Sequence, residues 1–368
     1  MKQDTPAGLQ NKEKEGAEAF ALDKLLTVVI PAYNSEKYLA RCLDSLILSN
    51  ACRAAQLLVI DDGSTDGTGR IADLYAERHA GVVKVLHKEN GGHGSCINAG
   101  IAAAKGKYFR VVDSDDTVDP KAFRAFLRCL QQIDSDLIAT PFVCVSEDKH
   151  SAGRESGRRG RLREPEGSGK LPGNVVFSFE DAADRLHVRM HQWTIRTAVL
   201  RDHAIRMSEH SFYVDMQFIS FPVPWIQTCC LLDFPVYRYH LGVKGQSVAA
   251  ESMRKNRGQH QRILCSLVRF YQERARAGDS GARLAYLAEN IAKMQADQVK
   301  SILSLPVGKK ALLKLRRSEQ WLARECPAGY AANKRKSLRL LRRSGYRLYG
   351  AAALAWRLRR IRKSGKLY

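Results

Sequence analysis

The chain has 368 residues, a hydrophobic content of 45% and a formal net charge of +22. This hydrophobic content is enough for a real core, so the composition excludes an intrinsically disordered protein. No apolar run reaches the roughly 18 to 20 residues of a membrane-spanning helix. The nine cysteines are scattered without CxxC or Cys/His spacing, which is typical of reduced structural thiols. We therefore expect a globular, cytoplasmic protein.

The positive charge is concentrated towards the C-terminus. From Lys309 onward, 19 lysines and arginines stand against only Glu319 and Glu325. The first 22 residues are polar and lack the basic-then-apolar order of a secretory signal, so we expect a disordered tail. The sequence predicts three parts: a tail over 1–22, an α/β domain over 23–250, and a helical, strongly basic region over 251–368.

Strand and helix patterns alternate four times in the first third of the chain. The strands are predicted in "LLTVVIPAYN", "AQLLVIDDGSTDGT", "VVKVLHKEN" and "KYFRVVDSDD", and the helices in "EKYLARCLDSLILS", "GRIADLYAERHA" and "GGHGSCINAGIAAAKG". This alternation favours a mainly parallel sheet with helices on both faces.

A polar cluster follows each of these four strands. The clusters read "PAYN", "DDGSTDGT", "ENGGHG" and "DSDD". In an open α/β sheet, ligands bind in the crevice beyond the carboxyl ends of the strands. Four polar loops at that edge therefore indicate a ligand-binding site.

The "DSDD" cluster places three carboxylates at the end of an apolar strand. Asp113, Asp115 and Asp116 repel one another unless a cation or a basic side chain offsets their charge. Mg²⁺ or Mn²⁺, held by one or two carboxylates together with diphosphate oxygens, is the usual solution. The alternative is a capped turn that begins the next helix, "VDPKAF".

The "NGGHG" stretch is a glycine-rich turn that opens a helix. Its backbone N–H groups, with Asn90 and His93, could contact a diphosphate or a sugar. It lacks the GxGxxG spacing of a dinucleotide site, and a simple helix cap is the alternative. Further along, His191 and Gln192 either face a second substrate or are structural.

Taken together, "VVIPAYNSEKYLARCLDSL", "LLVIDDGSTDGT", "NGGHGSCINAGIAAAKGKYFRVVDSDD" and "VYRYHLGVKGQSV" resemble the blocks of a family 2 glycosyltransferase. The resemblance covers roughly residues 25–250. It implies a GT-A catalytic domain, a Rossmann-like α/β fold with a mainly parallel sheet flanked by helices. It also implies inverting transfer of a sugar, most often from a UDP-sugar, with Mg²⁺ or Mn²⁺ as cofactor.

The resemblance also implies roles for individual residues. Nucleotide-sugar contacts would come from Pro31, Ala32, Tyr33, Asp61, Asp62, Ser64, Asn90, His93, Asp113, Ser114, Gln246 and Ser247. The metal would be held by Asp113 and Asp115, with Asp116 sharing the ion. The catalytic base aligns with Asp215 in "EHSFYVDMQF". Because Val214 replaces the first acidic residue of the family's usual pair, Glu209 is the second candidate.

The basic C-terminal region is expected to contact an anionic membrane surface. Leu338, Leu341, Leu348, Ala352 and Trp356 share approximately one helical face, with arginines around it. A solvated or domain-packing helix is the first alternative. Nucleic acid also suits the charge, but no recognition motif accompanies it, and we do not expect it.

The main functional hypothesis is therefore a metal-dependent, hexosyltransferase-type enzyme of cell-surface polysaccharide synthesis. It would transfer a sugar to a hydroxyl of a glycan or lipid-linked acceptor. The processive synthases of the family carry a QxxRW element and membrane spans. Neither is visible in this sequence, so we expect a single sugar to be added per encounter. The protein would lie in the cytoplasm, and contact of its basic region with a membrane would place it at the inner face of the cell membrane. The alternatives are a catalytically inactive nucleotide-sugar-binding module and a sugar nucleotidyltransferase, whose lysine-bearing glycine loop is missing.

Overall fold

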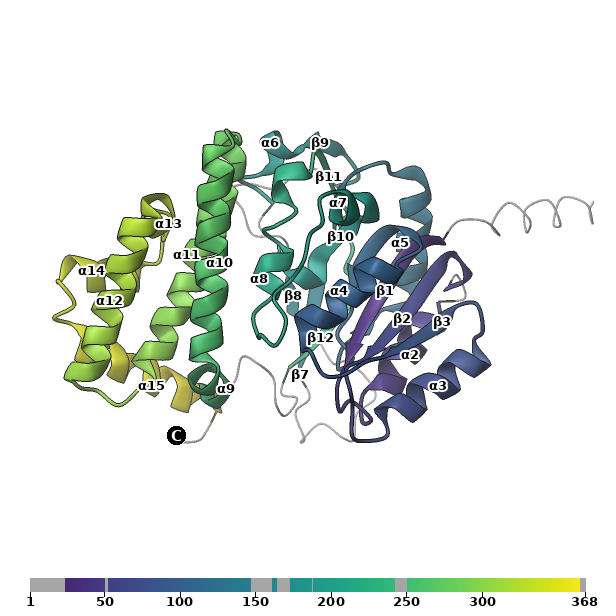
Figure 1. Ribbon diagram of the computed structural model, residues 1–368, viewed down its shortest axis with the longest axis horizontal. Coiled ribbons are helices and arrows are strands. Elements are labelled where there is room, and N and C mark those ends of the chain that lie inside the picture. The colour runs from purple at the N-terminus through teal and green to yellow at the C-terminus, as the bar shows by residue number, and fades with distance from the viewer. Residues whose placement is uncertain are drawn as a thin grey trace, which may run out of the picture.

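The computed structural model describes residues 24–49, 52–146, 161–163, 173–186, 188–241 and 250–364. All strands of the described part lie between residues 24 and 241, and residues 250–364 form helices. Figure 1 shows the α/β part on the right and the helical part on the left. The predicted tail over 1–22 and the residues Gln246 and Ser247 lie outside the described residues.

The main sheet has eight strands in the order β3-β2-β1-β4-β10-β6-β11-β9. Strand β1 pairs in parallel with β2 and β4, and β2 in parallel with β3, while β10 and β9 run antiparallel to their neighbours. The predicted mainly parallel sheet is therefore confirmed. Its strands are β1 (Lys24–Ala32), β2 (Ala55–Asp61), β3 (Val83–His87), β4 (Gly106–Val111), β6 (Leu137–Ala139), β9 (Val176–Ser178), β10 (Trp193–Arg196) and β11 (Thr228–Leu231).

Helices cover both faces of this sheet because its strands are apolar on both sides. One face packs against α2 (Leu39–Ile47), α3 (Thr68–Arg78) and α5 (Pro120–Gln132). The other packs against α4 (His93–Ala103), α7 (Thr197–Asp202) and α8 (Asp215–Phe218). Short helices α6 (Phe179–Ala182), η1 (Cys52–Ala54), η2 (Met190–Gln192) and η3 (Val223–Trp225) complete this part.

A second, four-stranded sheet lies beside the "DSDD" turn. Its order is β5-β12-β7-β8, with β5 (Thr117–Val118), β7 (Phe142–Ser146), β8 (Arg161–Arg163) and β12 (Tyr237–Leu241). The sequence predicts one strand in "SDLIATPFVCVS" and one in "TCCLLDFPVYRYHLG". Each prediction is wrong in the same way, because each stretch forms one strand of the main sheet and one of the small sheet. The chain crosses between sheets at Pro141 and near Pro235.

The helical region continues the core of the α/β part. Its first long helices are α10 (Arg257–Arg276) and α11 (Gly281–Leu303), preceded by α9 (Ala250–Lys255). Leu264, Leu267 and Ile291 share one buried cluster with Phe218 and Trp193. The two parts are therefore joined by a continuous apolar core.

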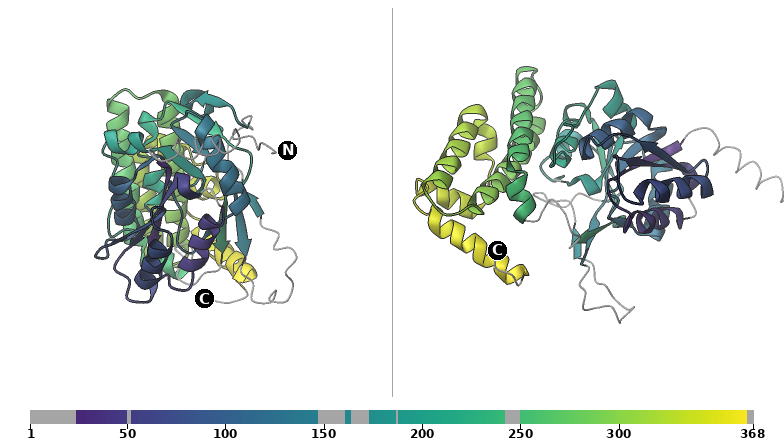
Figure 2. Two further views of the ribbon diagram at one scale, coloured as in Figure 1. Left: turned by 90° about the vertical axis from the view of Figure 1, so that its right-hand side faces the viewer. Right: turned by 60° about the horizontal axis from the view of Figure 1, so that its bottom comes forward.

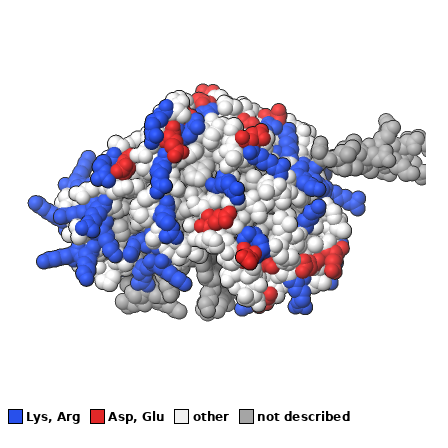
Figure 3. All heavy atoms as spheres, in the orientation of Figure 1, with Lys and Arg blue, Asp and Glu red and all other residues white. Residues whose placement is uncertain are grey.

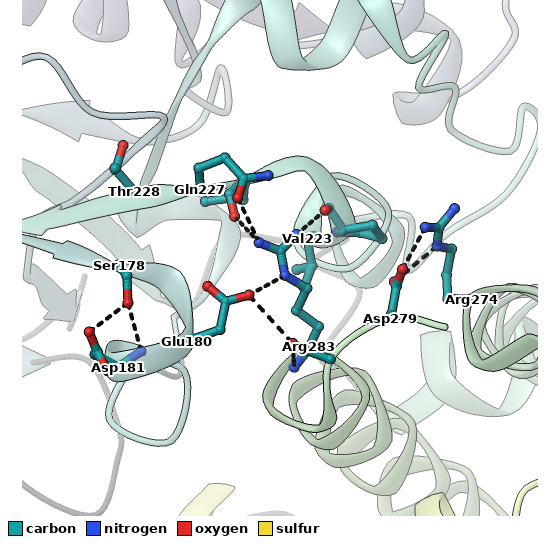
Figure 4. Close-up of polar contacts among 12 residues, drawn as sticks. Ser178, Glu180, Asp181, Val223, Gln227, Thr228, Arg274, Asp279 and Arg283 are labelled. Carbon is teal, nitrogen blue, oxygen red and sulfur yellow. Dashed lines mark hydrogen bonds and ion pairs between the residues drawn. The ribbon is translucent and has the colours of Figure 1, made fainter. Parts of the chain in front are cut away.

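A buried arginine reinforces this junction (Figure 4). Arg283 of α11 lies 2.7 Å from Glu180 Oε1, and it donates to the carbonyl oxygen of Ile226 at 3.0 Å and to Gln227 Oε1 at 3.2 Å. Glu180 lies in α6, and Ile226 and Gln227 follow η3, all on the α/β side. A buried guanidinium with this many acceptors fixes the start of α11 against the sheet domain.

The remaining helices extend from this core into a distal cluster, with Leu322 still in the shared core. They are α12 (Lys309–Glu325), α13 (Pro327–Ala331), α14 (Lys336–Arg343) and α15 (Tyr349–Ser364). Leu338 and Leu341 are buried in this cluster, and Ala352 and Trp356 are partly buried against it. The predicted membrane-facing stripe is therefore wrong, except for Leu348, because α14 and α15 use that apolar face to pack against α11 and α12. No helix in the described part is long and apolar enough to cross a membrane.

Candidate functional site

The loops that follow β1, β2, β3 and β4 meet at one edge of the main sheet. Hydrogen bonds link them directly. The Asn34 N–H donates to Ser64 Oγ at 3.0 Å, and the Ser35 and Ser114 hydroxyls lie 2.8 Å apart. The polar clusters predicted from the sequence are therefore adjacent in space, as expected for the carboxyl ends of parallel strands.

The first loop presents one exposed aromatic side chain. Pro31 and Ala32 are buried at the end of β1, whereas Tyr33 is 52% exposed. Tyr33 is thus available for stacking on a planar ring. Pro31 and Ala32 can contribute only backbone groups.

Asp62 organises the glycine-rich loop that precedes α4. Its carboxylate accepts hydrogen bonds from the N–H groups of Gly91 at 2.9 Å and Gly92 at 2.7 Å, and from Lys88 Nζ at 2.6 Å. The side chain of Asn90 donates to the Asp62 carbonyl oxygen at 3.0 Å. Asp62 and Asn90 therefore hold two loops together, and the Lys88 contact has no local signal in the sequence.

Asp61 is held by the end of the neighbouring strand. Its Oδ1 accepts from the Ser64 N–H at 3.1 Å, and its Oδ2 lies 2.9 Å from His87 Nδ1. Burial opposes ionisation of this carboxyl, but the hydrogen bonds from Ser64 and His87 outweigh it and lower its pKa. Asp61 is therefore a fixed anion, with His87 as a partner that the sequence analysis missed.

Within the "DSDD" turn, Asp113 and Asp115 are partly exposed and Asp116 is fully buried. Asp113 Oδ1 lies 2.8 Å from His93 Nε2, at the start of α4. Burial opposes the charge of both groups, yet their mutual attraction lowers the pKa of Asp113 and raises that of His93. Two of the predicted site residues, from separate loops, thus form an ion pair.

Asp116 has a different environment, because the small sheet closes over it. Its Oδ2 accepts from the Tyr237 hydroxyl at 2.6 Å and its Oδ1 from the His240 N–H at 2.7 Å. Burial, with the charges of Asp113 and Asp115, raises the pKa of Asp116 to about 9. Both oxygens point into the protein, so Asp116 is placed to fix the turn to β12 rather than to share a metal ion.

The carboxylates that remain fit a cation that arrives with its own oxygen ligands. In the part of the chain that the structure describes, no three His, Cys, Asp or Glu residues are grouped so that they could hold a metal ion. Mg²⁺, however, is usually bound by one or two carboxylates together with substrate phosphates and water. Asp113 and Asp115 fit that smaller requirement.

Asp215 is the first residue of α8 and faces the same centre. Its side chain is exposed at the surface, yet nearby protein atoms reduce its hydration. This loss of hydration raises the pKa of Asp215, and the charge of His93 opposes the rise. The charge of Asp215 in turn helps to raise the pKa of His93. The other candidate base, Glu209, is instead held by Asn98 of α4 at 3.0 Å.

The loop that leads to Asp215 packs on the glycine-rich loop. The His210 N–H donates to the Gly91 carbonyl oxygen at 2.5 Å, and His210 has a φ of 50°. A Cβ atom at Gly94 would lie 2.2 Å from the Ser208 carbonyl oxygen. This close approach requires glycine at position 94 and explains the third glycine of the "NGGHG" stretch.

The same loop is tied to the helical region. Gln217, which is 1% exposed, accepts from the Ser208 N–H at 2.8 Å and donates to the Ser266 hydroxyl of α10 at 2.8 Å. Tyr213 packs edge-on against His260 of α10, with ring centroids 4.8 Å apart. Helix α10 therefore supports the segment that carries Asp215.

An aromatic group borders Asp113 on the side of the small sheet. His191 stacks on Tyr239 with ring centroids 4.9 Å apart, and burial lowers the pKa of His191 to about 4. Gln192 is 1% exposed and accepts from the Arg189 N–H, so it is structural. Of these two residues, only His191 can face a substrate.

A hollow of about 580 Å³ lies at the opposite edge of the main sheet. Its lining includes Arg196 and Arg201, whose charges already have acceptors. Arg196 pairs with Asp134 at 2.6 Å and Asp136 at 2.9 Å, and Arg201 donates to the Ile101 carbonyl oxygen at 3.0 Å. It contains none of the converging carboxylates, so the loop edge remains the better candidate site.

The mainly parallel sheet, with an acidic turn after its fourth strand and clustered loops at one edge, defines an open α/β fold with a candidate ligand site at the carboxyl ends of its strands. Comparison with known proteins agrees. Residues 27–183 match the family described as glycosyl transferase family 2. This segment therefore belongs to glycosyltransferase family 2, and the fold is of the GT-A type.

Two curated relatives and one solved structure illustrate the likeness. Glycosyltransferase GlyG of Streptococcus pneumoniae is 38% identical over 118 residues, which are 32% of this chain and 38% of that protein. The chondroitin synthase of Escherichia coli is 32% identical over 155 residues, 42% of this chain and 21% of that protein. The matched stretch thus spans less than half of either relative.

The structural likeness extends much further along the chain. S. aureus TarS 1-349, solved in complex with UDP-GlcNAc, superposes with a TM-score of 0.61 and 20% identity. The superposition covers 94% of this chain and 93% of that one. The helical region is therefore part of the shared fold.

Proposed function

We propose that the protein is an inverting glycosyltransferase that uses a nucleotide-diphospho-sugar. The observation that carries this proposal is that Asp113, at 2.8 Å, and the charge of Asp215 both act on His93, at the edge where the loop of the exposed Tyr33 meets the "DSDD" turn through Ser35. In this proposal Asp113 and Asp115 are the metal–diphosphate ligands and Asp215 is the base, and sugar transfer requires both in one site. The family match supports the reaction class.

The donor side is assigned to the four converging loops. Tyr33 would stack on the base, and the loops fixed by Asp61, Ser64, Asp62 and Asn90 would surround the nucleoside. The UDP-GlcNAc bound by TarS supports a UDP-sugar as donor. We keep Ser114 as a residue that positions the turn through Ser35, and Gln246 and Ser247 as predicted diphosphate contacts.

Asp113 and Asp115 would hold Mg²⁺ or Mn²⁺, and such an ion neutralises charge that builds on the leaving diphosphate. Tyr237 donates a hydrogen bond to Asp116, and Asp116 thereby fixes the turn that carries these two carboxylates. His93, paired with Asp113, places a positive charge at the N-terminus of α4, where phosphate oxygens are also favoured by the helix dipole. These residues bind and orient the leaving group.

Asp215 would act on the acceptor. As the acceptor oxygen forms its bond to the anomeric carbon and the bond to the diphosphate breaks, the hydroxyl proton passes to Asp215. Partial loss of hydration raises the pKa of this carboxyl, and a carboxylate with a higher pKa is a stronger base. Attack from the side opposite the diphosphate inverts the anomeric configuration.

We further propose that the acceptor is a glycan or lipid-linked hydroxyl in cell-surface polysaccharide synthesis, and that one hexose is added per encounter. The similarity to a chondroitin synthase supports a polysaccharide product. A cytoplasmic site of action is supported by eight free cysteines in the described part of the chain.

Hydrolysis of a panel of nucleotide sugars, with Mn²⁺ or Mg²⁺, tests this function. We expect slow release of one nucleotide, abolished by chelation and by Asp115→Ala. If no donor is hydrolysed but one nucleotide binds in a metal-dependent way, the protein is a binding module and the proposed activity is wrong.

A further inference from the structure

Helix α15 carries an apolar stripe that faces outwards. Ala351, Leu354, Ala355 and Leu358 are exposed at i, i+3, i+4 and i+7, with Leu354 at 58% and Leu358 at 51% exposure. The opposite face of the same helix packs inwards through Tyr349 and Ala353. Helix α15 is therefore apolar on two faces, of which only one is used by the fold.

Helix α14 adds a basic face next to this stripe. Lys336, Arg339, Leu340 and Arg343 are exposed on it, again at i, i+3, i+4 and i+7. Leu340 is 58% exposed among these cations, and Leu348, between the helices, is 43% exposed. The outward surfaces of both helices thus combine leucines with arginines.

Few carboxylates lie near these helices, and the two of α11 that approach α14 are paired, Glu289 with Lys334 at 2.9 Å and Asp297 with Lys300 at 2.5 Å. Within 309–358, the carboxylates are Glu319, which is buried against Arg342 at 2.5 Å, and Glu325, which pairs with Arg324 at 2.9 Å. Figure 3 shows lysines and arginines gathered over the helical end of the molecule. Helix α15 continues to Ser364 through the sequence "RRIRKS".

Among the described residues, no element covers the outer face of α15. The second view of Figure 2 shows α15 along the margin of the molecule, away from the main sheet. Arg357 anchors it to the Leu305 carbonyl oxygen after α11. A fixed helix at the margin can lie flat on an extended surface without rearrangement of the domain.

We propose that α14 and α15 dock the protein on an anionic lipid bilayer, with Leu354 and Leu358 inserted at the interface and the α14 arginines on the headgroups. Neither feature alone identifies the partner. Cations suit any polyanion, but a row of exposed leucines beside them is typical of interfacial helices. On a nucleic acid, these leucines would gain no burial.

This inference goes beyond the proposed activity, and its test involves no turnover. Co-sedimentation is measured with phosphatidylcholine vesicles that contain about one third phosphatidylglycerol, and with pure phosphatidylcholine vesicles. We expect binding to the anionic vesicles at least about tenfold tighter than to the neutral ones. Leu354→Glu with Leu358→Glu should weaken it at least about tenfold, because insertion into the interface is lost.

Matched variants separate this surface from general effects. Leu48→Glu with Leu74→Glu changes two exposed leucines of the α/β part and should leave vesicle binding unchanged. Arg339→Gln with Arg343→Gln should weaken binding, whereas Lys84→Gln with Arg128→Gln, also exposed, should not. Equal thermal unfolding of all variants by circular dichroism checks that the fold is intact.

Several outcomes would overturn the proposal. Wild-type protein that does not bind anionic vesicles, or binds them as well after the Leu354/Leu358 change, contradicts it. Sedimentation equilibrium that shows a dimer abolished by that change, without vesicle binding, would assign the stripe to a second copy of the chain. Binding to an oligonucleotide alone, lost with the arginines, would assign the surface to nucleic acid.

Discussion

The α/β part and the distal helices differ in which charged side chains they hold inside the protein and which they expose to solvent. The α/β part places carboxylates at one edge of its sheet, where they accept hydrogen bonds from other groups of the protein. Asp62, for example, accepts from the N–H groups of Gly91 and Gly92. The distal helices bury one carboxylate, Glu319, and leave most of their cations in solvent. The difference separates a preorganised site for a small ligand from a surface that suits an extended anionic partner.

The largest expected effect distinguishes the two candidate bases. Asp215→Asn should lower kcat for sugar transfer by about a thousandfold, because a positioned base contributes about 10² to 10⁴ in rate. Glu209→Gln should change kcat by less than about threefold, since Asn98 holds this side chain away from the charge cluster. A thousandfold loss with Glu209→Gln, and none with Asp215→Asn, would reverse the assignment.

A glycine contact comes next in size. Gly94→Ala would place a methyl group on the Ser208 carbonyl oxygen and displace the loop that leads to Asp215. We expect kcat to fall by about a hundredfold, an effect of the size that a 1 Å displacement produces. Gly258→Ala on α10, where a Cβ meets nothing within 4 Å, is the control. Equal activity of both variants would show that the loop tolerates displacement.

The distal cluster should respond in stability and not in chemistry. Glu319→Gln leaves Arg342 without its anion in a nearly closed site. We expect urea unfolding to show a loss of about 3 kcal/mol, because breaking a buried pair leaves an uncompensated charge. Glu325→Gln, in the same helix but more exposed, should cost less than about 1 kcal/mol. If Glu319→Gln lowered kcat as well as stability, the expectation that the distal helices take no part in the chemistry would be wrong.

The smallest expected effect concerns an exposed pair of the α/β part. Hydrogen bonds from Arg196 and Lys107 lower the pKa of Asp134 from 3.8 to about 2. The pair therefore stabilises the fold above pH 4, and its contribution disappears as the pH falls towards 2. Asp134→Asn should lower Tm by about 1 to 2 °C at pH 7 and by nothing near pH 2. Calorimetry across this range, with Asp202→Asn as control, checks the sign; a difference that grows at low pH would contradict it.

Local sequence patterns predicted the parallel strands, α4 and the edge at which the loops meet. They could not predict the role of Asp116, because its partners Tyr237 and His240 lie 121 and 124 residues away. The C-terminal helices show the same limit of sequence-based prediction. Periodicity finds apolar stripes on α14 and α15, but only contact with α11 and α12 decides that Leu338 turns inwards and Leu354 outwards.

The most direct test of the central claim is a calorimetric titration of UDP, with and without Mn²⁺. Wild-type protein and Asp134→Asn should bind UDP with metal and much more weakly without it, and Asp115→Ala should lose the metal-dependent part. Binding that is indifferent to both Mn²⁺ and Asp115, or no binding at all, would contradict a metal–diphosphate site at the loop edge.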